Sequence, residues 1–341
     1  MIDWLKLTDE QRKTSLAQAS RESGITTKAL EKDWWVTLTL RALFQSKYAD
    51  ALIFKGGTSL SKCWKLIERF SEDIDIAIDP ELFGIAYKPE PGSGYLNRLK
   101  RMGCEFTSNE LKAELEAEFI NLGLAKGIVI VTAGEIQPTM KDKDPQELYV
   151  KYTSLYDPNP YLADEVKIEV GVRSKLEPFS KVEVNSLLTE FFPNDAYPSV
   201  PFAVQAVEPR KTFLEKAFLL QEEFEKSDKE RIRTDRMSRH YYDLEKMMDS
   251  GVCADALADH KLYLAIVKHR SFYSKQKDFD YNKLFPGEID FIPPAAYIDG
   301  YHKDYGIMRD NMIYGNSLDA KGLFARIDEL KDRFRNIKLP E

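Results

Sequence analysis

Two aspartates spaced two residues apart, a short distance after a pair of glycines, are the residues best placed to do chemistry in this chain. They lie in the stretch from Phe54 to Ile78, which reads FKGGTSLSKCWKLIERFSEDIDIAI. Asp73 and Asp75 alternate with isoleucines, and residues two apart on a strand point to the same face. Their Cα atoms would lie about 6.6 Å apart. Two carboxylates at that spacing can share a pair of Mg²⁺ ions, so the pattern predicts a divalent-metal site.

The glycine pair predicts a second feature, a phosphate-binding site. The apolar run 51–54 indicates a buried strand that ends at Gly56 and Gly57, and residues 58–68 indicate a helix. Glycine permits positive φ and a close approach of the backbone to a ligand. The free N–H groups of Gly56, Gly57 and Thr58 would face an anion at the positive end of that helix. A turn followed by an exposed edge strand is the plain alternative, but the two features together favour nucleotide chemistry.

The surrounding sequence predicts the elements that must hold this segment. Thr8 and Gln11 form a candidate capping box, and Gly24 separates a first helix from a second over 27–45. A further helix is expected over 109–121. Strands are expected at 128–132, 148–153 and 166–170, because short apolar runs there alternate with polar residues.

Two regions rich in proline and glycine are expected to lack regular structure, namely 84–103 and 178–202. Beyond Pro209 the composition is helical, with helices expected over 212–224, 239–248 and 323–337. The sequence therefore predicts an α+β protein in which an α+β domain occupies residues 1–203. A mainly helical domain is expected over 204–341.

Composition limits the class of protein. The 341 residues carry 49 Lys and Arg against 56 Asp and Glu, a net charge of −7, which argues against a surface that binds nucleic acid everywhere. Three cysteines without CxxC spacing and four histidines argue against a disulfide scaffold and a zinc ribbon. We find no signal peptide and no apolar window long enough to cross a membrane, so the protein is expected to be cytoplasmic.

The glycine and aspartate motifs resemble those of the AbiEii/AbiGii toxin family, within the DNA polymerase β-like nucleotidyltransferase superfamily. The superfamily pattern is hG[GS], then [DE]h[DE]h, and later h[DE]h on a neighbouring strand. Ile168-Glu169-Val170 is the best match to the last element, so the resemblance implies that Glu169 joins Asp73 and Asp75 as a metal ligand. Asp164 and Glu165 are nearby competitors. Many relatives have aspartate where this chain has Glu169.

The resemblance continues downstream and implies further site residues. Residues 208–216 end in T-F-x-E-K, and the family's lysine, here Lys216, is expected to contact the triphosphate. Residues 236–244 match R-x-S-R-H-Y-Y-D-L, which makes Asp243 a functional aspartate, with Arg239 and His240 as weaker candidates. Ser71 is a further candidate for nucleotide binding. The run 31–33, Glu-Lys-Asp, also resembles a family element and is expected to position the site.

The resemblance implies a nucleotidyltransferase that depends on Mg²⁺, with Mn²⁺ as an alternative ion, and that uses a nucleoside triphosphate as substrate. It implies an RNA acceptor, namely the 3′ end of tRNA. It also implies a toxin of a type IV toxin–antitoxin or phage abortive-infection system, whose antitoxin acts without forming a stable complex. Residues 229–240 contain five Lys and Arg against two Asp and Glu, which suits RNA phosphates or, equally, an ordinary solvated helix face.

Other classes of function stay open on the sequence. A catalytically weak nucleotide-binding regulator, a protein nucleotidyltransferase, a metal-dependent nuclease and a protein-interaction module each account for part of the pattern. The chain has no P-loop, no kinase motifs and no Gly-x-Ser-x-Gly elbow, and His240 has no partner at metal-ligand spacing.

Overall fold

The computed structural model describes residues 1–136, 143–158, 162–274, 276 and 278–339. These residues form two compact units. The first unit comprises Met1–Cys63, Phe70–Tyr87 and Ser93–Val207, and the second comprises Trp64–Arg69, Lys88–Gly92 and Glu208–Glu341. In the described part of the chain, no helix is both long and apolar enough to span a membrane.

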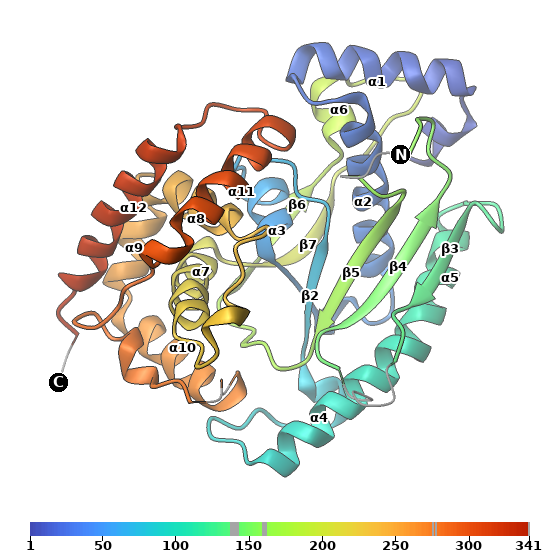
Figure 1. Cartoon of the computed structure of the whole chain (residues 1–341). Coiled ribbons are helices and arrows are strands. Elements are labelled where there is room, and N and C mark those ends of the chain that lie inside the picture. The colour runs from blue at the N-terminus through green and yellow to red at the C-terminus, as the bar shows by residue number, and fades with distance from the viewer. Residues whose placement is uncertain (137–142, 159–161, 275, 277, 340–341) are drawn as a thin grey trace. The chain divides into compact units, whose positions relative to one another are not determined.

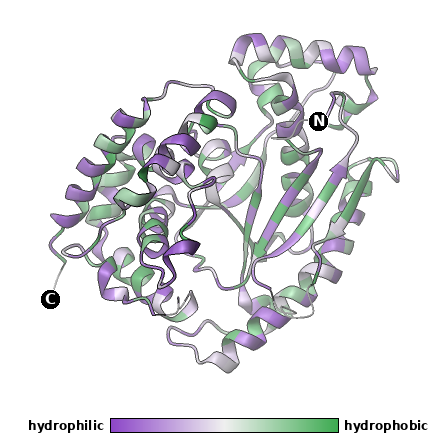
Figure 2. Cartoon of the chain, viewed as in Figure 1, coloured by the Kyte–Doolittle hydropathy of each residue, from purple (hydrophilic) through white to green (hydrophobic). Residues whose placement is uncertain are grey.

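A mixed sheet forms the centre of the first unit. Within the described residues it has seven strands in the order β3-β4-β5-β2-β1-β7-β6 (Figure 1). The pairs β2–β5 and β1–β7 are parallel, and the other neighbours are antiparallel. Figure 2 shows hydrophobic residues along these strands with hydrophilic residues between them. The strands are β1 (Leu52–Lys55), β2 (Ile74–Ile78), β3 (Val129–Ala133), β4 (Gln146–Tyr152), β5 (Glu165–Gly171), β6 (Phe179–Val184) and β7 (Phe202–Val207).

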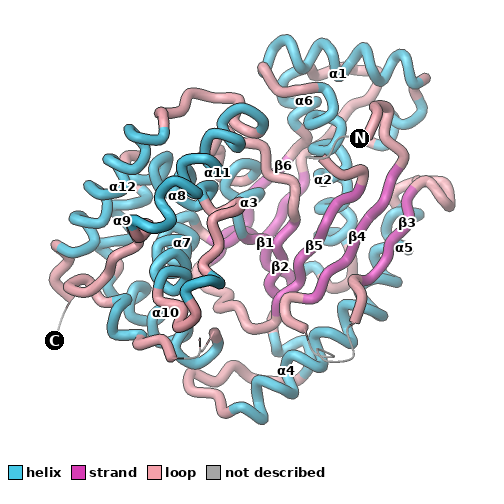
Figure 3. Tube along the Cα trace, in the orientation of Figure 1, coloured by secondary structure: helices cyan, strands magenta, loops and turns pink. Residues whose placement is uncertain are grey.

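Helices of the first unit pack against this sheet (Figure 3). Helix α2 contacts β5 and β7, and α5 contacts both β3 and α2, so α2 and α5 lie in one layer. Together with the sheet they confirm the predicted α+β class. The helices are α1 (Asp9–Ser23), α2 (Thr27–Gln45), α3 (Gly56–Lys62), α4 (Ser93–Phe106), α5 (Lys112–Asn121) and α6 (Leu187–Phe191).

Helix α2 is the central helix of this unit. The Thr26 side chain caps its start by accepting a hydrogen bond from the Ala29 N–H. Fourteen of its nineteen residues are buried, so the helix is enclosed on all sides rather than along one stripe. The predicted capping box of Thr8 and Gln11 at the start of α1 is also present.

Three sequence predictions of local structure were wrong. The helix after the glycine pair is α3, which ends at Lys62 instead of reaching residue 68; Lys65 then adopts φ +53°, which helical backbone does not permit. Residues 93–106 form α4, although prolines and glycines precede and begin it. The proline-rich segment 178–202 contains β6 and α6, because its prolines lie outside both elements.

The second unit is helical and is built around α8. Helix α8 contacts α7, α9, α11 and α12. The buried Tyr241 and Tyr263 donate their hydroxyls to the carbonyls of Phe291 and Leu284, so these large rings are buried without an unpaired polar group. The helices are α7 (Pro209–Phe224), α8 (Ser238–Met248), α9 (Val252–Ala258), α10 (His260–Tyr273), α11 (Ile298–Asn311) and α12 (Ala320–Arg335).

A short segment from early in the sequence belongs to this helical unit. Residues 64–69 follow α3, and the carbonyl of Glu68 accepts hydrogen bonds from the backbone N–H groups of Tyr314 and Gly315. Arg69 forms a β-bridge with Ile313. The segment therefore carries Arg69 into the interior of the second unit, four residues before Asp73.

Candidate active site

The turn from β1 into α3 places a glycine directly against an acidic side chain. Gly56 has φ +82°, and a Cβ added there would lie 2.0 Å from Oδ2 of Asp75. The register between β1 and β2 puts Lys55 opposite Asp75, with the Lys55 Nζ 4.0 Å from Asp75 Oδ1. Glycine is required at position 56 both for its backbone conformation and for the room that the Asp75 carboxylate occupies.

Hydroxyl groups fix the backbone that leads to the aspartates. The Thr58 Oγ1 lies 2.5 Å from the carbonyl oxygen of Asp73 and 2.9 Å from the Ser71 Oγ. Thr58 is buried, so its hydroxyl serves this internal contact. The side chains of Thr58 and Ser71 therefore tie α3 to the segment before β2. A phosphate contact by Thr58 would use its backbone N–H.

Three acidic side chains from adjacent strands share one face of the sheet. The parallel register of β2 and β5 puts Asp75 opposite Glu169, and the antiparallel register of β4 and β5 puts Glu147 opposite Glu169. Residues directly opposite each other on neighbouring strands point to the same face. Asp73 immediately precedes β2.

The two alternatives to Glu169 as the third metal ligand lie at the start of β5 or before it. Asp164 pairs with Lys28 at 2.9 Å, and Glu165 lies opposite Lys151 at the start of the strand. Neither is opposite Asp75, so the register favours Glu169 among the three candidates.

A lysine bridges two of the carboxylates. The Lys167 Nζ lies 2.5 Å from Glu169 Oε1 and 3.2 Å from Glu147 Oε1. Burial opposes the charge of Lys167, but the hydrogen bond and charge of Glu169, and then those of Glu147, outweigh it and raise the lysine pKa. The pKa of Glu147 is lowered because its contacts with Lys143 and Lys167 outweigh its own burial. Glu169 is thus held by a cation of the protein itself.

The donor atoms suit a hard cation that a nucleotide helps to bind. Mg²⁺ takes oxygen ligands, commonly one or two carboxylates together with substrate phosphates. Among the described residues, no group of three or more His, Cys, Asp and Glu side chains is arranged to hold a metal ion by itself. The carboxylate pair of Asp73 and Asp75, beside the Gly56 turn, fits an ion whose remaining ligands come from phosphate and water.

A buried ion cluster in the second unit contains the two site residues expected there. Asp243 is fully buried, and Arg69 donates to both of its oxygens, from Nε at 2.7 Å and Nη2 at 2.8 Å. The Lys216 Nζ lies 2.9 Å from Asp243 Oδ2 and 3.4 Å from His240 Nδ1. The structure thus brings Lys216, Asp243 and His240 together, with Arg69 as an added member.

The ionisable groups of this cluster shift one another's pKa values. Burial disfavours the Asp243 carboxylate, but Arg69 and Lys216 outweigh it and hold the pKa of Asp243 well below its usual value. Burial lowers the pKa of Lys216, against the attraction of Asp243 and with the repulsion of Arg69 and Arg239. Burial, and then Lys216 and Arg239, hold the pKa of His240 well below its ordinary value, so its imidazole is neutral.

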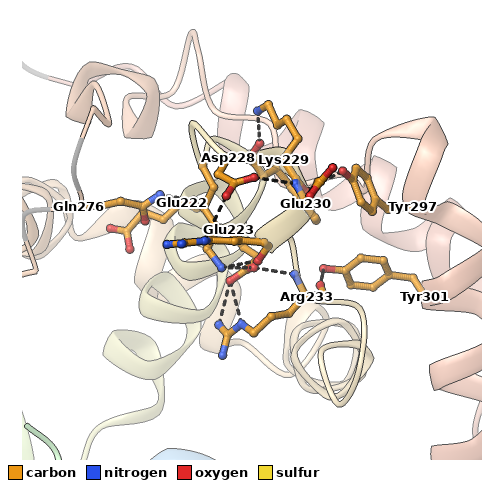
Figure 4. A network of polar contacts seen from close by, with 12 residues as sticks. Glu222, Glu223, Asp228, Lys229, Glu230, Arg233, Gln276, Tyr297 and Tyr301 are labelled. Atoms are coloured by element: carbon orange, nitrogen blue, oxygen red, sulfur yellow. Dashed lines mark hydrogen bonds and ion pairs between the residues drawn. The ribbon is translucent and has the colours of Figure 1, made fainter. Parts of the chain in front are cut away.

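The basic segment 229–240 is held in place by contacts within the second unit (Figure 4). Glu223 is buried and accepts from the backbone N–H of Arg233 and from its guanidinium. Tyr297 and Tyr301 donate their hydroxyls to the carbonyls of Lys229 and Arg233. The positive charge of this segment is therefore partly neutralised by the protein, although the side chain of Arg231 remains 80% exposed.

Arg69, Glu147 and Lys167 are members of these clusters that sequence reasoning missed. Arg69 lies inside the resemblance to the family, but its bidentate contact with a residue 174 positions away leaves no local signal. Glu147 alternates with apolar residues like any strand residue. Only the order β4-β5-β2 of the sheet identifies it as a neighbour of Glu169.

The chain is similar to the nucleotidyltransferase toxin MenT4 from Mycobacterium tuberculosis, with 17% identity over 95% of this chain and 99% of that chain and a TM-score of 0.45. No curated protein matches it. A family model described as nucleotidyl transferase AbiEii toxin, type IV toxin–antitoxin system, matches residues 39–333. Since this match covers most of the chain, the protein belongs to the AbiEii family of nucleotidyltransferase toxins.

Proposed function

We propose that this nucleotidyltransferase moves a nucleoside monophosphate from a nucleoside triphosphate to an RNA hydroxyl, at the 3′ end of tRNA. The acceptor oxygen forms a bond to the α-phosphorus, the bond to the bridging oxygen breaks, and pyrophosphate leaves. The observation that carries the proposal is the facing pair Asp75 and Glu169 on parallel strands, with Gly56 packed against Asp75. We propose residues 1–203 as the nucleotidyltransferase domain and 204–341 as the helical domain.

In this proposal the first unit binds the reacting phosphates. The backbone N–H groups of Gly56, Gly57 and Thr58 bind phosphate oxygens. The Thr58 hydroxyl, which also contacts the Ser71 hydroxyl, holds the backbone of Asp73. Asp73 and Asp75, assisted by Glu169, would hold Mg²⁺ or Mn²⁺. When bound, such ions stabilise negative charge on the phosphates and lower the pKa of the acceptor hydroxyl.

The residues of the second unit enter the proposal through the family resemblance. Lys216 supplies the charge for the triphosphate, as the family resemblance implies, and Arg239 assists it. Asp243 fixes the Lys216 ammonium at 2.9 Å, and Arg69 supplies the second charge that keeps Asp243 ionised. Asp243 then acts by orienting Lys216, because its own oxygens are already bonded to two cations.

The acceptor and the biological setting are proposed from an exposed arginine and from the family. The exposed Arg231 and the family resemblance favour RNA as the acceptor. As a member of a type IV toxin family, the protein would have an antitoxin partner that acts without a stable complex, and it would serve in phage defence. A cytoplasmic location suits both roles.

A catalytically weak nucleotide-binding regulator is the second candidate. The observation that favours it is the contact of Lys167 with Glu169, which occupies the third carboxylate. In that case nucleotide would bind but turnover would be slow, because the acceptor side would have one ligand fewer.

One labelling experiment tests the proposal. Purified protein would be incubated with Mg²⁺, each α-³²P nucleoside triphosphate in turn, total tRNA and cell lysate. Asp75→Ala would be the inactive variant, and Asp195→Ala, at an exposed aspartate of the same unit, the matched control. Label on RNA that requires Asp75 is expected.

Each other outcome replaces a different part of the proposal. Label on protein would keep the transfer chemistry and change the acceptor to protein. RNA cleavage without label would indicate a nuclease. Bound nucleotide without any label would favour the regulator.

A further inference from the structure

Three consecutive charged residues of α2 are buried in the first unit. Glu31, Lys32 and Asp33 are only 1%, 3% and 5% exposed. Charged side chains are rarely buried to this extent unless they are paired, so each of the three should have a defined partner. Glu31 accepts hydrogen bonds from the Ser154 hydroxyl at 2.6 Å and the Leu155 N–H at 2.9 Å, both just after β4.

Lys32 holds the residue that precedes the first aspartate of the site. Its Nζ lies 2.5 Å from Glu72 Oε2 and donates to the carbonyl of Ala163 at 2.9 Å. Glu72 is itself buried and is bonded directly to Asp73 along the chain. The ion pair therefore fixes the peptide that leads into β2.

Asp33 holds the opposite end of the glycine helix. Its Oδ1 lies 2.5 Å from the Lys62 Nζ, and its Oδ2 accepts from the Leu187 N–H at 2.7 Å. Lys62 is the last residue of α3, whose first residue is Gly56. The position of the Gly56 turn thus depends on a contact made by α2.

A hydrogen bond of Thr58 links the elements that hold these two ion pairs. The Thr58 hydroxyl, one turn before Lys62 in α3, bonds to the Asp73 carbonyl. Helix α2, helix α3 and the segment before β2 are consequently linked at three points. Two of those links are buried ion pairs that start from neighbouring residues of α2.

We propose that Lys32 and Asp33 are positioning residues for nucleotidyl transfer, which set where the Asp73 carboxylate and the Gly56 turn lie. The inference rests on the proposed function of those two groups. A buried ion pair adds little net stability compared with uncharged residues of similar size, so stability alone does not account for two such pairs here. Residues that orient metal ligands typically change metal affinity or activity by 10- to 100-fold when they are replaced.

The double variant Lys32→Met/Glu72→Gln separates positioning from stability. Both charges are removed together, so no buried charge is left without a partner. We expect its melting temperature to stay within about 4 °C of wild type. We expect its affinity for Mn²⁺ to fall about tenfold or more in the presence of a non-hydrolysable α,β-methylene nucleotide. Electron paramagnetic resonance of free Mn²⁺ measures that affinity without turnover.

Glu222→Gln/Arg270→Met is the matched control, because it removes both charges of an ion pair in the second unit that the proposal does not place in the site. Its Mn²⁺ affinity should equal that of wild type. If the first double variant does not fold, Asp33→Asn/Lys62→Met provides the same test at the other pair.

The outcomes distinguish this inference from the function on which it rests. If the wild type binds Mn²⁺ with the nucleotide and the double variant binds it equally well, the positioning role is overturned and the proposed function stands. If wild type itself does not bind Mn²⁺ with the nucleotide, the proposed function is overturned and the inference with it.

Discussion

The two units treat their central carboxylates in opposite ways. Asp243 of the second unit is fully buried, and Arg69 and Lys216 bond to both of its oxygens. Asp75 of the first unit has a side chain that is 24% exposed, and the Lys55 Nζ lies 4.0 Å from its Oδ1. Asp243 already has its counter-charges, whereas the partly exposed Asp75 carboxylate is within reach of a ligand. We infer that Asp75 binds and that Asp243 positions.

The largest expected effect is on activity, from a change at Asp75. Asp75→Asn should lower the transfer rate about 10³-fold, because a charge that acts on the reacting phosphates is lost. Because the side chain is partly exposed, the melting temperature should stay nearly unchanged. Initial rates of label transfer and a thermal melt measure the two quantities. A rate within tenfold of wild type would remove Asp75 from the site.

Asp243→Asn should instead destabilise the fold. It leaves Arg69 and Lys216 buried without their carboxylate, and breaking a buried pair in this way lowers the free energy of unfolding by about 3–5 kcal/mol. Denaturant unfolding measures the loss. A variant as stable as wild type would contradict the view that Asp243 is the structural counter-charge.

The pH dependence sharpens the same comparison. The folded pKa of Asp243 is depressed, so its contribution to stability is present above its unfolded pKa of about 3.9 and is lost as the pH falls toward the folded pKa. The difference in unfolding free energy between wild type and Asp243→Asn should therefore be full at pH 6 and shrink below pH 4. A difference that stays constant over this range would show that the carboxylate charge is not its source.

Gly56→Ala tests the turn that carries Asp75. The added Cβ would meet the Asp75 carboxylate and force a side chain onto φ +82°, so we expect a loss of about 1–3 kcal/mol of stability together with weaker nucleotide binding. Gly84→Ala is the matched control, because Gly84 has φ +65° but nothing within 4 Å of its added Cβ. Equal loss of nucleotide binding in the two variants would mean that backbone strain alone, and not Asp75, is responsible.

The smallest expected effect comes from Lys167. Lys167→Met removes a positive charge beside Glu169, and Mn²⁺ affinity should rise about threefold, as expected for one charge acting through a partly aqueous medium. Lys143 pairs with Glu147 Oε2, so Lys143→Met should change the affinity less. A fall in affinity for Lys167→Met would show that the lysine helps to hold Glu169 for the ion.

The sequence was sufficient for the parts of the site that depend on local geometry. The period of two over 73–78 and the glycine pair predicted where Asp75 and Gly56 lie, and 27–45 was predicted as a helix to the residue. The short α3 could not be foreseen, because residues 64–69 are helical in composition but bind residues 313–315. Their partner is more than 240 positions away, so tertiary contact overrode local preference.

The distance between partners in the sequence also explains why these ion pairs were not predicted. Lys32 and Glu72 are 40 positions apart, and Arg69 and Asp243 are 174 apart. Nothing in the local pattern of either partner identifies the other. Such pairs follow from the order of the strands and from the burial of α2, which a single sequence without its fold does not contain.

The excursion of residues 64–69 into the second unit has a consequence for how this protein can be recombined. A chimera joined at residue 207 would take Arg69 from one parent and Asp243 from the other, although both residues belong to the same ion cluster. Neither half is then an independent module, because residues 64–69 come from the first half of the sequence but belong to the helical unit. Homologues should exchange these halves only when the six-residue segment is exchanged with the helical half.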